Sequence, residues 1–386
     1  MRALTSTIIH TGIRDLTDYA IIIQENGFIK ALVPTNDVPK EIKLERISAR
    51  HLAPGFIDLQ VNGSGGFMFG DQPTDDCINT IAHYQHRFGV TGFLPTLISG
   101  PLEVMSEATK AVDKAIKNTP GVLGIHFEGP FLNPKHTGIH EVKMLKKYND
   151  SLECHITPCK FGKTLVTLAP ELIKNTQIQN MISKGILVAA GHTSAGPADI
   201  SRATEAGLTG VTHLFNAMEQ MTARSPGTVG AALTNDALWC SIIADGFHVH
   251  PTTLLAAWRA KPPGKLILVS DSMAPVGKKS MTKFMSCGQE IYVKDGKCTN
   301  SKNKLAGSLG TLDSAVRFCV TKVGIPLNEA LRMASTYPAK AIGEDNRRGL
   351  IEPGYVADLV SLDHKLYPQK IWISGTEINI NTDKVL

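Results

Sequence analysis

Three side chains in this sequence are of the types that together bind a divalent metal ion. Glu128 ends the mostly apolar run of residues 121–128, and His192 and His213 each lie at the end of a further short apolar run. Two imidazoles and a carboxylate, with one position left open for water, form the ligand set of hydrolytic metal centres. A single histidine is more often a satisfied polar residue at a strand end. The prediction of a metal site therefore depends on all three meeting in space.

Asp271 and two histidines add groups that are suited to act on a substrate. Asp271 ends another apolar run, where its carboxylate is placed either to cap a turn or to take a proton from water and return it to a leaving group. His140 and His248 follow the apolar runs that end at Glu128 and Asp245. Histidines on loops beside a site are placed to contact substrate.

The elements that must position these residues repeat from residue 55 onward. Short apolar runs alternate with amphipathic segments of helical period, such as residues 76–88 and 103–116. The eight runs are residues 55–62, 92–98, 122–128, 164–171, 186–192, 210–215, 240–245 and 265–271. Eight such alternations predict an α/β fold of the (β/α)₈ TIM barrel type. Residues 63–66 are rich in glycine but lack the spacing of a dinucleotide-binding loop.

A TIM barrel carries its active site at the carboxyl ends of its strands. The predicted strands place a set of polar residues there, more than packing requires: Gln60, Asn62, Glu128, His192, His213, Asp245 and Asp271. Because all eight strand ends surround one opening, residues far apart in the sequence are expected to share one site.

The two ends of the chain show a different pattern. Residues 1–52 contain short apolar runs around the turn signal Asn26-Gly27, which predicts a small antiparallel β unit. Residues 349–363 return to a β pattern. We expect a β-sandwich domain formed by residues 1–52 and 348–386, and a catalytic barrel domain over residues 53–347.

Composition excludes several classes of partner. The net charge is +5, and the one dense basic run, residues 143–147, lacks interleaved aromatic residues, so no nucleic-acid partner is expected. No apolar run reaches 18 residues, and the amino terminus has no apolar leader, so no membrane partner is expected. The seven cysteines, Cys154 among them, are scattered without a Cys-x-x-Cys pair, which predicts a reducing, cytoplasmic location.

Several motifs together resemble the amidohydrolase superfamily, and in particular its amino-sugar-phosphate deacetylases, over nearly the whole chain. They are Pro54-Gly-Phe-Ile-Asp58, His126-Phe-Glu-Gly-Pro130, Ala190-Gly-His192-Thr, Thr212-His-Leu-Phe-Asn-Ala-Met218, Ile243-Ala-Asp-Gly-Phe-His248, Ser270-Asp271 and Leu305-Ala-Gly-Ser308. The resemblance implies that Glu128, His192 and His213 are metal ligands. It also implies that Asp271 is the general acid and base, and that His140 polarises the acetamide carbonyl.

The same resemblance implies the substrate and its contacts. The reaction implied is hydrolysis of N-acetylglucosamine 6-phosphate to glucosamine 6-phosphate and acetate, with N-acetylgalactosamine 6-phosphate as the alternative substrate. It further implies that Arg224 reaches the phosphate in the neighbouring subunit of a homodimer, a task that suits the planar guanidinium. The other residues implied to contact substrate are Asn216, Ala217, His248 and Leu305.

One departure from the superfamily pattern concerns the metal. Most amidohydrolases end the first barrel strand with His-x-His, which binds a second ion, whereas this chain has Gln60-Val61-Asn62. Neutral amides lack the imidazole lone pair. We expect one divalent ion per subunit, Zn²⁺ foremost, although this ligand set selects weakly among metals. Two other classes stay open: a non-catalytic barrel with a decayed site, and a metal-free sugar-phosphate isomerase.

Overall fold

The centre of the molecule is an eight-stranded parallel barrel. The structure is a computed structural model that describes residues 1–148 and 155–380, so Cys154 lies outside the described residues. Its strands, in chain order, are β8 (Phe56–Val61), β11 (Val90–Ile98), β12 (Gly124–Glu128), β13 (Lys163–Leu168), β14 (Ile186–Ala190), β15 (Gly210–Val211), β16 (Trp239–Ile243) and β17 (Leu266–Val269). One strand falls in each of the eight predicted runs, and neighbours in the chain are neighbours in the sheet. The predicted TIM barrel is confirmed.

The barrel is closed by contacts between its first and last strands. The backbone N–H groups of Asn62 and Gly63 both donate to the carbonyl of Ser272 at 3.0 Å. Below them the Asp58 carboxylate accepts from the backbone N–H of Gln60 at 3.1 Å and of Ser270 at 3.2 Å. Asp58 is fully buried, and this burial raises its pKa to about 7. A buried carboxylate therefore joins the two strands next to Asp271.

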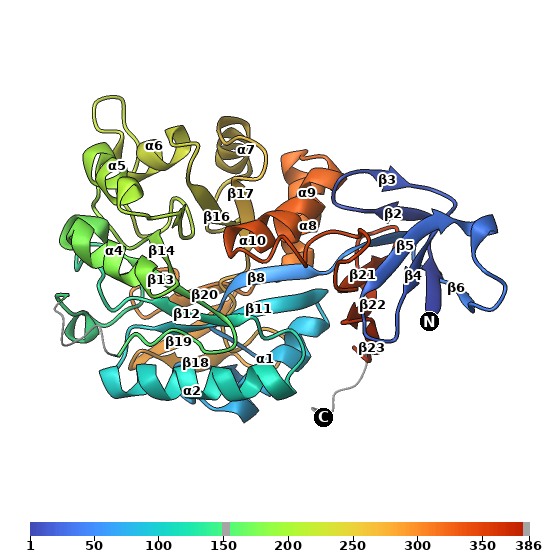
Figure 1. Cartoon of the computed structure of the whole chain (residues 1–386). Coiled ribbons are helices and arrows are strands. Elements are labelled where there is room, and N and C mark those ends of the chain that lie inside the picture. Colours follow the sequence, from blue (N-terminus) through green and yellow to red (C-terminus); the bar gives the residue numbers. More distant parts are fainter. Residues whose placement is uncertain (149–154, 381–386) are drawn as a thin grey trace.

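Helices cover the outside of the barrel (Figure 1). They are α1 (Asp75–His86), α2 (Leu102–Asn118), α4 (Asn175–Ser183), α5 (Pro197–Glu205), α6 (Gly227–Thr234), α7 (Pro251–Ala260), α8 (Leu312–Phe318), α9 (Leu327–Ala334) and α10 (Thr336–Ala341). The first shows why such segments are helical. The Thr74 side chain accepts from the N–H of Cys77, and Asp75 and Asp76 place negative charge at the positive end of the helix dipole. None of the described helices has the length and apolar character needed to cross a membrane.

Two sheets lie beside the barrel, one of amino-terminal strands alone and one of strands from both ends of the chain (Figure 1). The amino-terminal strands are β1 (Arg2–Thr5), β2 (Ile8–His10), β3 (Asp15–Leu16), β4 (Tyr19–Ile23), β5 (Ile29–Pro34), β6 (Leu44–Arg46) and β7 (His51–Pro54). The carboxyl-terminal strands are β21 (Leu359–Leu362), β22 (Pro368–Ile373) and β23 (Thr376–Ile378). One sheet has the order β5-β4-β1-β6, and the other has the order β23-β22-β21-β7-β2-β3. The pair β7–β21 therefore joins the two ends, while the domain boundaries stay a prediction.

The amino-terminal unit differs from the expected antiparallel unit in two of its pairings. The turn at Asn26-Gly27 does join the antiparallel strands β4 and β5, but β1 pairs with β6 and β2 pairs with β7 in parallel. Parallel neighbours need long connections, and here more than thirty residues separate the paired strands. Local turn signals do not report such non-local pairs. Leu4, Ile21 and Trp372 lie in one apolar cluster that holds both sheets together.

A small insertion lies near the carboxyl ends of the barrel strands. It is a three-stranded antiparallel sheet of β18 (Lys283–Ser286), β19 (Gln289–Lys294) and β20 (Lys297–Asn300). Phe284 and Ile291 of this sheet share an apolar cluster with Met273 and Ile139, which line the cavity described next. The short pair β9 (Gly63–Ser64) and β10 (Phe67–Met68) contributes Met68 to the same cluster. The insertion thus forms part of the wall of the site.

Candidate metal centre and active site

Four of the predicted site residues lie at or just beyond the carboxyl ends of their strands. Glu128 is the last residue of β12, and His192, His213 and Asp271 each lie two residues beyond β14, β15 and β17. These last three residues have positive φ angles of 49°, 36° and 49°. Non-glycine residues seldom adopt this conformation, and where they do so the strain often marks a functional site. All four side chains line one cavity of about 170 Å³.

Glu128, His192 and His213 come together as closely as metal ligands do. The Oε1 atom of Glu128 lies 3.1 Å from His192 Nε2 and 2.8 Å from His213 Nε2, and the two nitrogens are 3.1 Å apart. Bonds of about 2.1 Å to a tetrahedral ion would separate neighbouring ligand atoms by about 3.4 Å. Only a small outward shift would therefore admit an ion between them.

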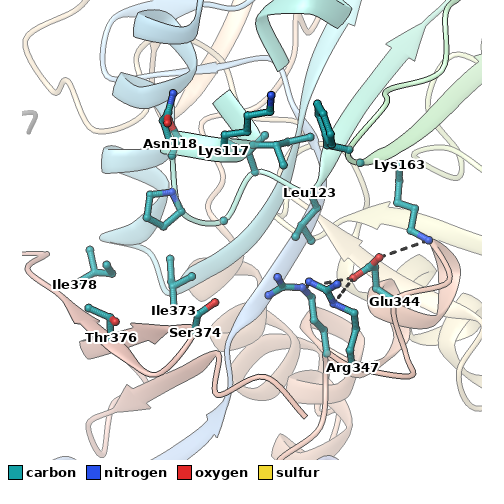
Figure 2. Close-up of a pocket in the computed structure, with 18 of the residues that line it drawn as sticks. Lys117, Asn118, Leu123, Lys163, Glu344, Arg347, Ile373, Ser374, Thr376 and Ile378 are labelled. Atoms are coloured by element: carbon teal, nitrogen blue, oxygen red, sulfur yellow. Dashed lines mark ion pairs between the residues drawn. The ribbon is translucent and has the colours of Figure 1, made fainter. Parts of the chain in front are cut away.

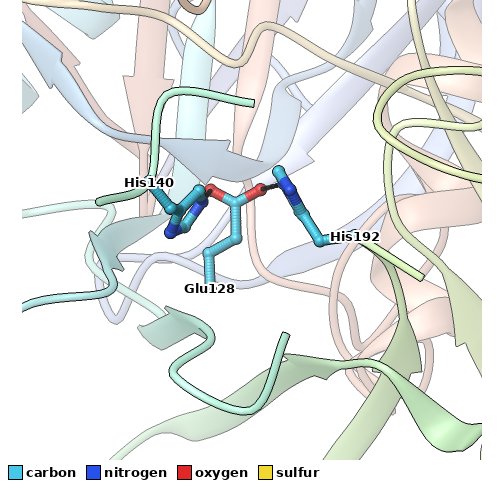
Figure 3. A group of neighbouring side chains, drawn as sticks. All are labelled: Glu128, His140 and His192. Carbon is cyan, nitrogen blue, oxygen red and sulfur yellow. Dashed lines mark hydrogen bonds and ion pairs between the residues drawn. The ribbon is translucent and has the colours of Figure 1, made fainter. Parts of the chain in front are cut away.

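His140 is a fourth member of this cluster, and it differs from the others in its hydrogen bonding. Its Nε2 lies 3.7 Å from Glu128 Oε2, and Figure 3 shows Glu128 between His140 and His192. Ligand atoms of these three residues also lie within 4.8 Å of one another. However, the backbone N–H of Ser99 donates to His140 Nδ1 at 3.2 Å, so the neutral ring carries its hydrogen on Nε2. That nitrogen is a donor, which favours His213 over His140 as the third ligand.

The charges in the cluster favour a cation. Burial raises the pKa of Glu128, but its contacts with His140, His192 and His213 lower that pKa by more, so the net pKa lies well below its usual range. Burial lowers the pKa of His192 to about 4. His192 Nδ1 donates to the carbonyl of His136 at 2.7 Å, so its Nε2 lone pair faces the carboxylate of Glu128. Two hydrogen-bond acceptors that face each other in a buried site repel, and a positive ion between them would satisfy both.

Three residues around this cluster each carry one unsatisfied polar atom. His213 Nδ1, Gln60 Oε1 and Asn62 Oδ1 are buried and have no hydrogen-bond partner among the described residues. Buried polar atoms are almost always paired, with protein, water or an ion. The orphaned oxygens of Gln60 and Asn62, beside a carboxylate and two imidazoles, fit a centre that holds a metal ion and water.

The residues expected to contact substrate divide into two groups. Asn216, Ala217, His248 and Leu305 line the same cavity as Glu128. Arg224 does not line it; it is exposed on the connection between β15 and α6. Asp271 is buried, and burial followed by the nearby charge of Glu128 raises its pKa to about 6.

Asp245 and Ser308 hold one of these residues in place, a role that the sequence did not reveal. Asp245 Oδ2 accepts from His248 Nδ1 at 2.7 Å and from the Ser308 hydroxyl at 3.0 Å. The neutral His248 ring is then left with an acceptor at Nε2. The position of Asp245 at a strand end is the one sequence signal for this contact, because Ser308 is 63 residues away.

Comparison with known proteins decides the family. Residues 51–384 match the profile of the Amidohydrolase family, and residues 1–50 match the NagA composite domain. The chain belongs to the amidohydrolase family.

Three relatives show how far the similarity extends. An N-acetylgalactosamine-6-phosphate deacetylase of Shewanella sp. (strain ANA-3) is 37% identical, over 94% of this chain and 92% of that protein. An N-acetylglucosamine-6-phosphate deacetylase of Haemophilus influenzae is 33% identical, over 98% of each chain. The crystal structure of N-acetylglucosamine-6-phosphate deacetylase from Pasteurella multocida superposes with a TM-score of 0.94, at 33% identity over 98% of this chain and 99% of that one.

In this amidohydrolase, Gln60 and Asn62, the departure from the His-x-His pattern noted in the sequence, both bind carboxylates. Gln60 Nε2 donates to Glu128 Oε1 at 3.0 Å, and Asn62 Nδ2 donates to Asp271 Oδ1 at 2.6 Å. Each amide thus orients one of the two acidic groups of the site. The single-ion stoichiometry stays a prediction, and these contacts are compatible with it.

Metal analysis of two amide variants tests the ligand set. Glu128→Gln keeps the size of the side chain but removes its charge, so we expect purified protein to lose its bound divalent metal, as measured by elemental mass spectrometry. Asp271→Asn is the matched control, because Asp271 does not supply one of the three clustered ligand atoms. This variant should retain the wild-type metal content. An unchanged metal content in Glu128→Gln would contradict the assignment.

Proposed function

We propose that this amidohydrolase removes the acetyl group of N-acetylglucosamine 6-phosphate by hydrolysis, giving glucosamine 6-phosphate and acetate. The observation that carries the proposal is the buried cluster of Glu128, His192 and His213 beside Asp271. It occurs in a chain that matches named deacetylases over nearly its full length. The free cysteines of the described residues support a reducing compartment such as the cytoplasm.

Glu128, His192 and His213 would hold one divalent ion per subunit, for which Zn²⁺ is the expected metal. When bound, such an ion supplies Lewis-acid chemistry, which polarises a carbonyl group and makes water easier to deprotonate. The set of two imidazoles and one carboxylate suits this task.

Asp271 is proposed to carry the proton. Only its Oδ1 has a donor among the described residues, the Asn62 amide, so the other oxygen is available. A carboxyl pKa of about 6 lies close to neutral pH, where a group can both accept and return a proton. Asp271 would take the proton as the water oxygen bonds to the acetamide carbon. It would then give that proton to the sugar nitrogen as the carbon–nitrogen bond breaks.

His140 and His248 are proposed to bind two parts of the substrate, the acetamide carbonyl and a sugar hydroxyl. The Nε2–H of His140 can donate to the carbonyl oxygen and to the negative charge that develops there. The Nε2 lone pair of His248 can accept from a sugar hydroxyl, because Asp245 holds its other nitrogen. Asn216, Ala217 and Leu305 line the remaining wall, where the sugar phosphate would lie.

Arg224 is proposed to act on the neighbouring site of a homodimer. Its exposure and its absence from the cavity of its own chain are what such a role requires. Met221, on the same connection, is 58% exposed, and a large apolar side chain of this kind is suited to a subunit contact.

A second candidate substrate is N-acetylgalactosamine 6-phosphate, which the Shewanella relative favours. The two sugars differ in the orientation of one ring hydroxyl. The Haemophilus relative and the Pasteurella structure favour the glucosamine compound, which we retain as the substrate.

The assignment of Asp271 predicts the behaviour of Asp271→Asn. The amide cannot accept a proton, so turnover should fall by roughly two to four orders of magnitude while metal is retained. Acetate release under saturating substrate measures this directly. Turnover near that of the wild type would show that another group moves the proton.

Mixed subunits test the role of Arg224. His140→Ala and Arg224→Ala chains should each be nearly inactive alone, because each lacks one part of every site. Co-expression should restore about a quarter of wild-type activity, since half of the dimers are hybrid and each contains one complete site. If Arg224 serves its own subunit, no hybrid site is complete and activity stays low.

Kinetics with the two epimers tests the substrate. We expect kcat/KM to be at least about tenfold higher for N-acetylglucosamine 6-phosphate, because a site that bonds one hydroxyl discriminates against its misplacement. Acetate release should be measured with both sugars on one protein preparation. The opposite preference would select the galactosamine compound and leave the metal chemistry unchanged.

A further inference from the structure

A second, larger cavity of about 670 Å³ is lined by residues at the other end of the barrel. Figure 2 shows the side chains that line it. Its walls are the last turn of α2, the residues that lead into β12 and β13, the segment after α10, and residues 373–378 near the carboxyl terminus. These are the amino ends of the barrel strands, whereas Glu128 and Asp271 lie at the carboxyl ends. The two cavities share no lining residue.

Positive charge dominates this cavity. Its one acidic lining residue among the described residues is Glu344, against five basic ones: Lys117, Lys160, Lys163, Arg347 and Arg348. Glu344 is already shared, because its carboxylate lies 3.4 Å from Lys163, 3.2 Å from Arg347 and 3.5 Å from Arg348 (Figure 2). Arg348 also pairs with Asp358 behind the wall. The cavity therefore holds more positive charge than its own carboxylates balance.

Two of these cations are free to bind a ligand. Lys117 and Lys160 have no acidic side-chain partner among the described residues, and their ammonium groups lie 4.3 Å and 5.3 Å from the centre of the Phe161 ring. The nearby Asp113 carboxylate accepts from the backbone N–H groups of Lys160 and Phe161 at 2.9 Å and 3.1 Å, so it shapes the loop. Phe161 itself is 48% exposed. The two ammonium groups thus lie over a half-exposed aromatic ring that also lines the cavity.

We propose that this cavity binds a small phosphate-bearing anion. Arg347 is 52% exposed at its side chain, and its planar guanidinium can contact two phosphate oxygens at once. Lys117 and Lys160 neutralise the remaining charge from their positions over the Phe161 ring. The volume lies within the range of small-molecule sites. Because the catalytic residues are elsewhere, this site stands or fails independently of the proposed reaction.

Titration calorimetry on the full chain in phosphate-free buffer tests the site. The probes are pyrophosphate, glucosamine 6-phosphate and ADP, which distinguish an inorganic anion, a sugar phosphate and a nucleotide as the source of the phosphate. The Lys117→Ala/Lys160→Ala double variant should weaken binding at least about tenfold, because two charged contacts are lost. The matched control is Lys40→Ala/Lys110→Ala, which removes the same charge from two exposed lysines outside the cavity and should bind as the wild type does.

Three outcomes would overturn the proposal. They are an absence of binding by any probe, unchanged binding in the cavity variant, and equal weakening in both double variants. The last would report only the overall charge of the protein. Lys117 and Lys160 are exposed, so thermal unfolding without ligand should match that of the wild type and show that each variant is folded. Binding at the catalytic face would survive in both double variants as a component that does not change.

Discussion

The structure of the site depends on one buried charge, the carboxylate of Glu128. A carboxylate that is removed from water must be paired, and its partners here arrive from four different parts of the barrel. Gln60 donates from β8, while His140, His192 and His213 approach from segments that follow β12, β14 and β15. Every strand that supplies a partner must end at the same level. One carboxylate thus has partners from four parts of the barrel.

Two features of the backbone place these side chains: positive φ angles at three site residues, and the contacts that close the barrel. His192, His213 and Asp271 are held at positive φ, which costs conformational energy that the surrounding barrel must offset. Part of that support is visible at Asp58, whose buried carboxylate binds the backbone of Gln60 and Ser270. Asp58 thereby positions Gln60, which lies two residues before Asn62, and Ser270, which precedes Asp271. The contacts that close the barrel therefore also support Asn62 and Asp271.

The sequence was sufficient for the features that local pattern encodes. Each apolar run contains a strand. Glu128, His192, His213 and Asp271 lie at strand ends because each is at or near the last residue of its run. The sequence pattern did not predict which individual residues far apart in the chain contact each other. The parallel pair β1–β6, the bond from Ser308 to Asp245 and the basic cavity around Phe161 all arise from tertiary packing. Backbone strain leaves no trace in residue type when a catalytic side chain occupies the position.

Gln60 and Asn62 show why a missing motif need not signal decay. A decayed site would keep its residues without mutual geometry, yet each amide here donates to a carboxylate on another strand. The Asn62 bond takes one oxygen of Asp271 and leaves the other available, as the proposed proton transfer requires. An imidazole with its lone pair turned toward a second ion would compete for the same carboxylates. A neutral donor at this position therefore orients Asp271 instead of attracting a second metal ion, which fits the proposed single-ion centre.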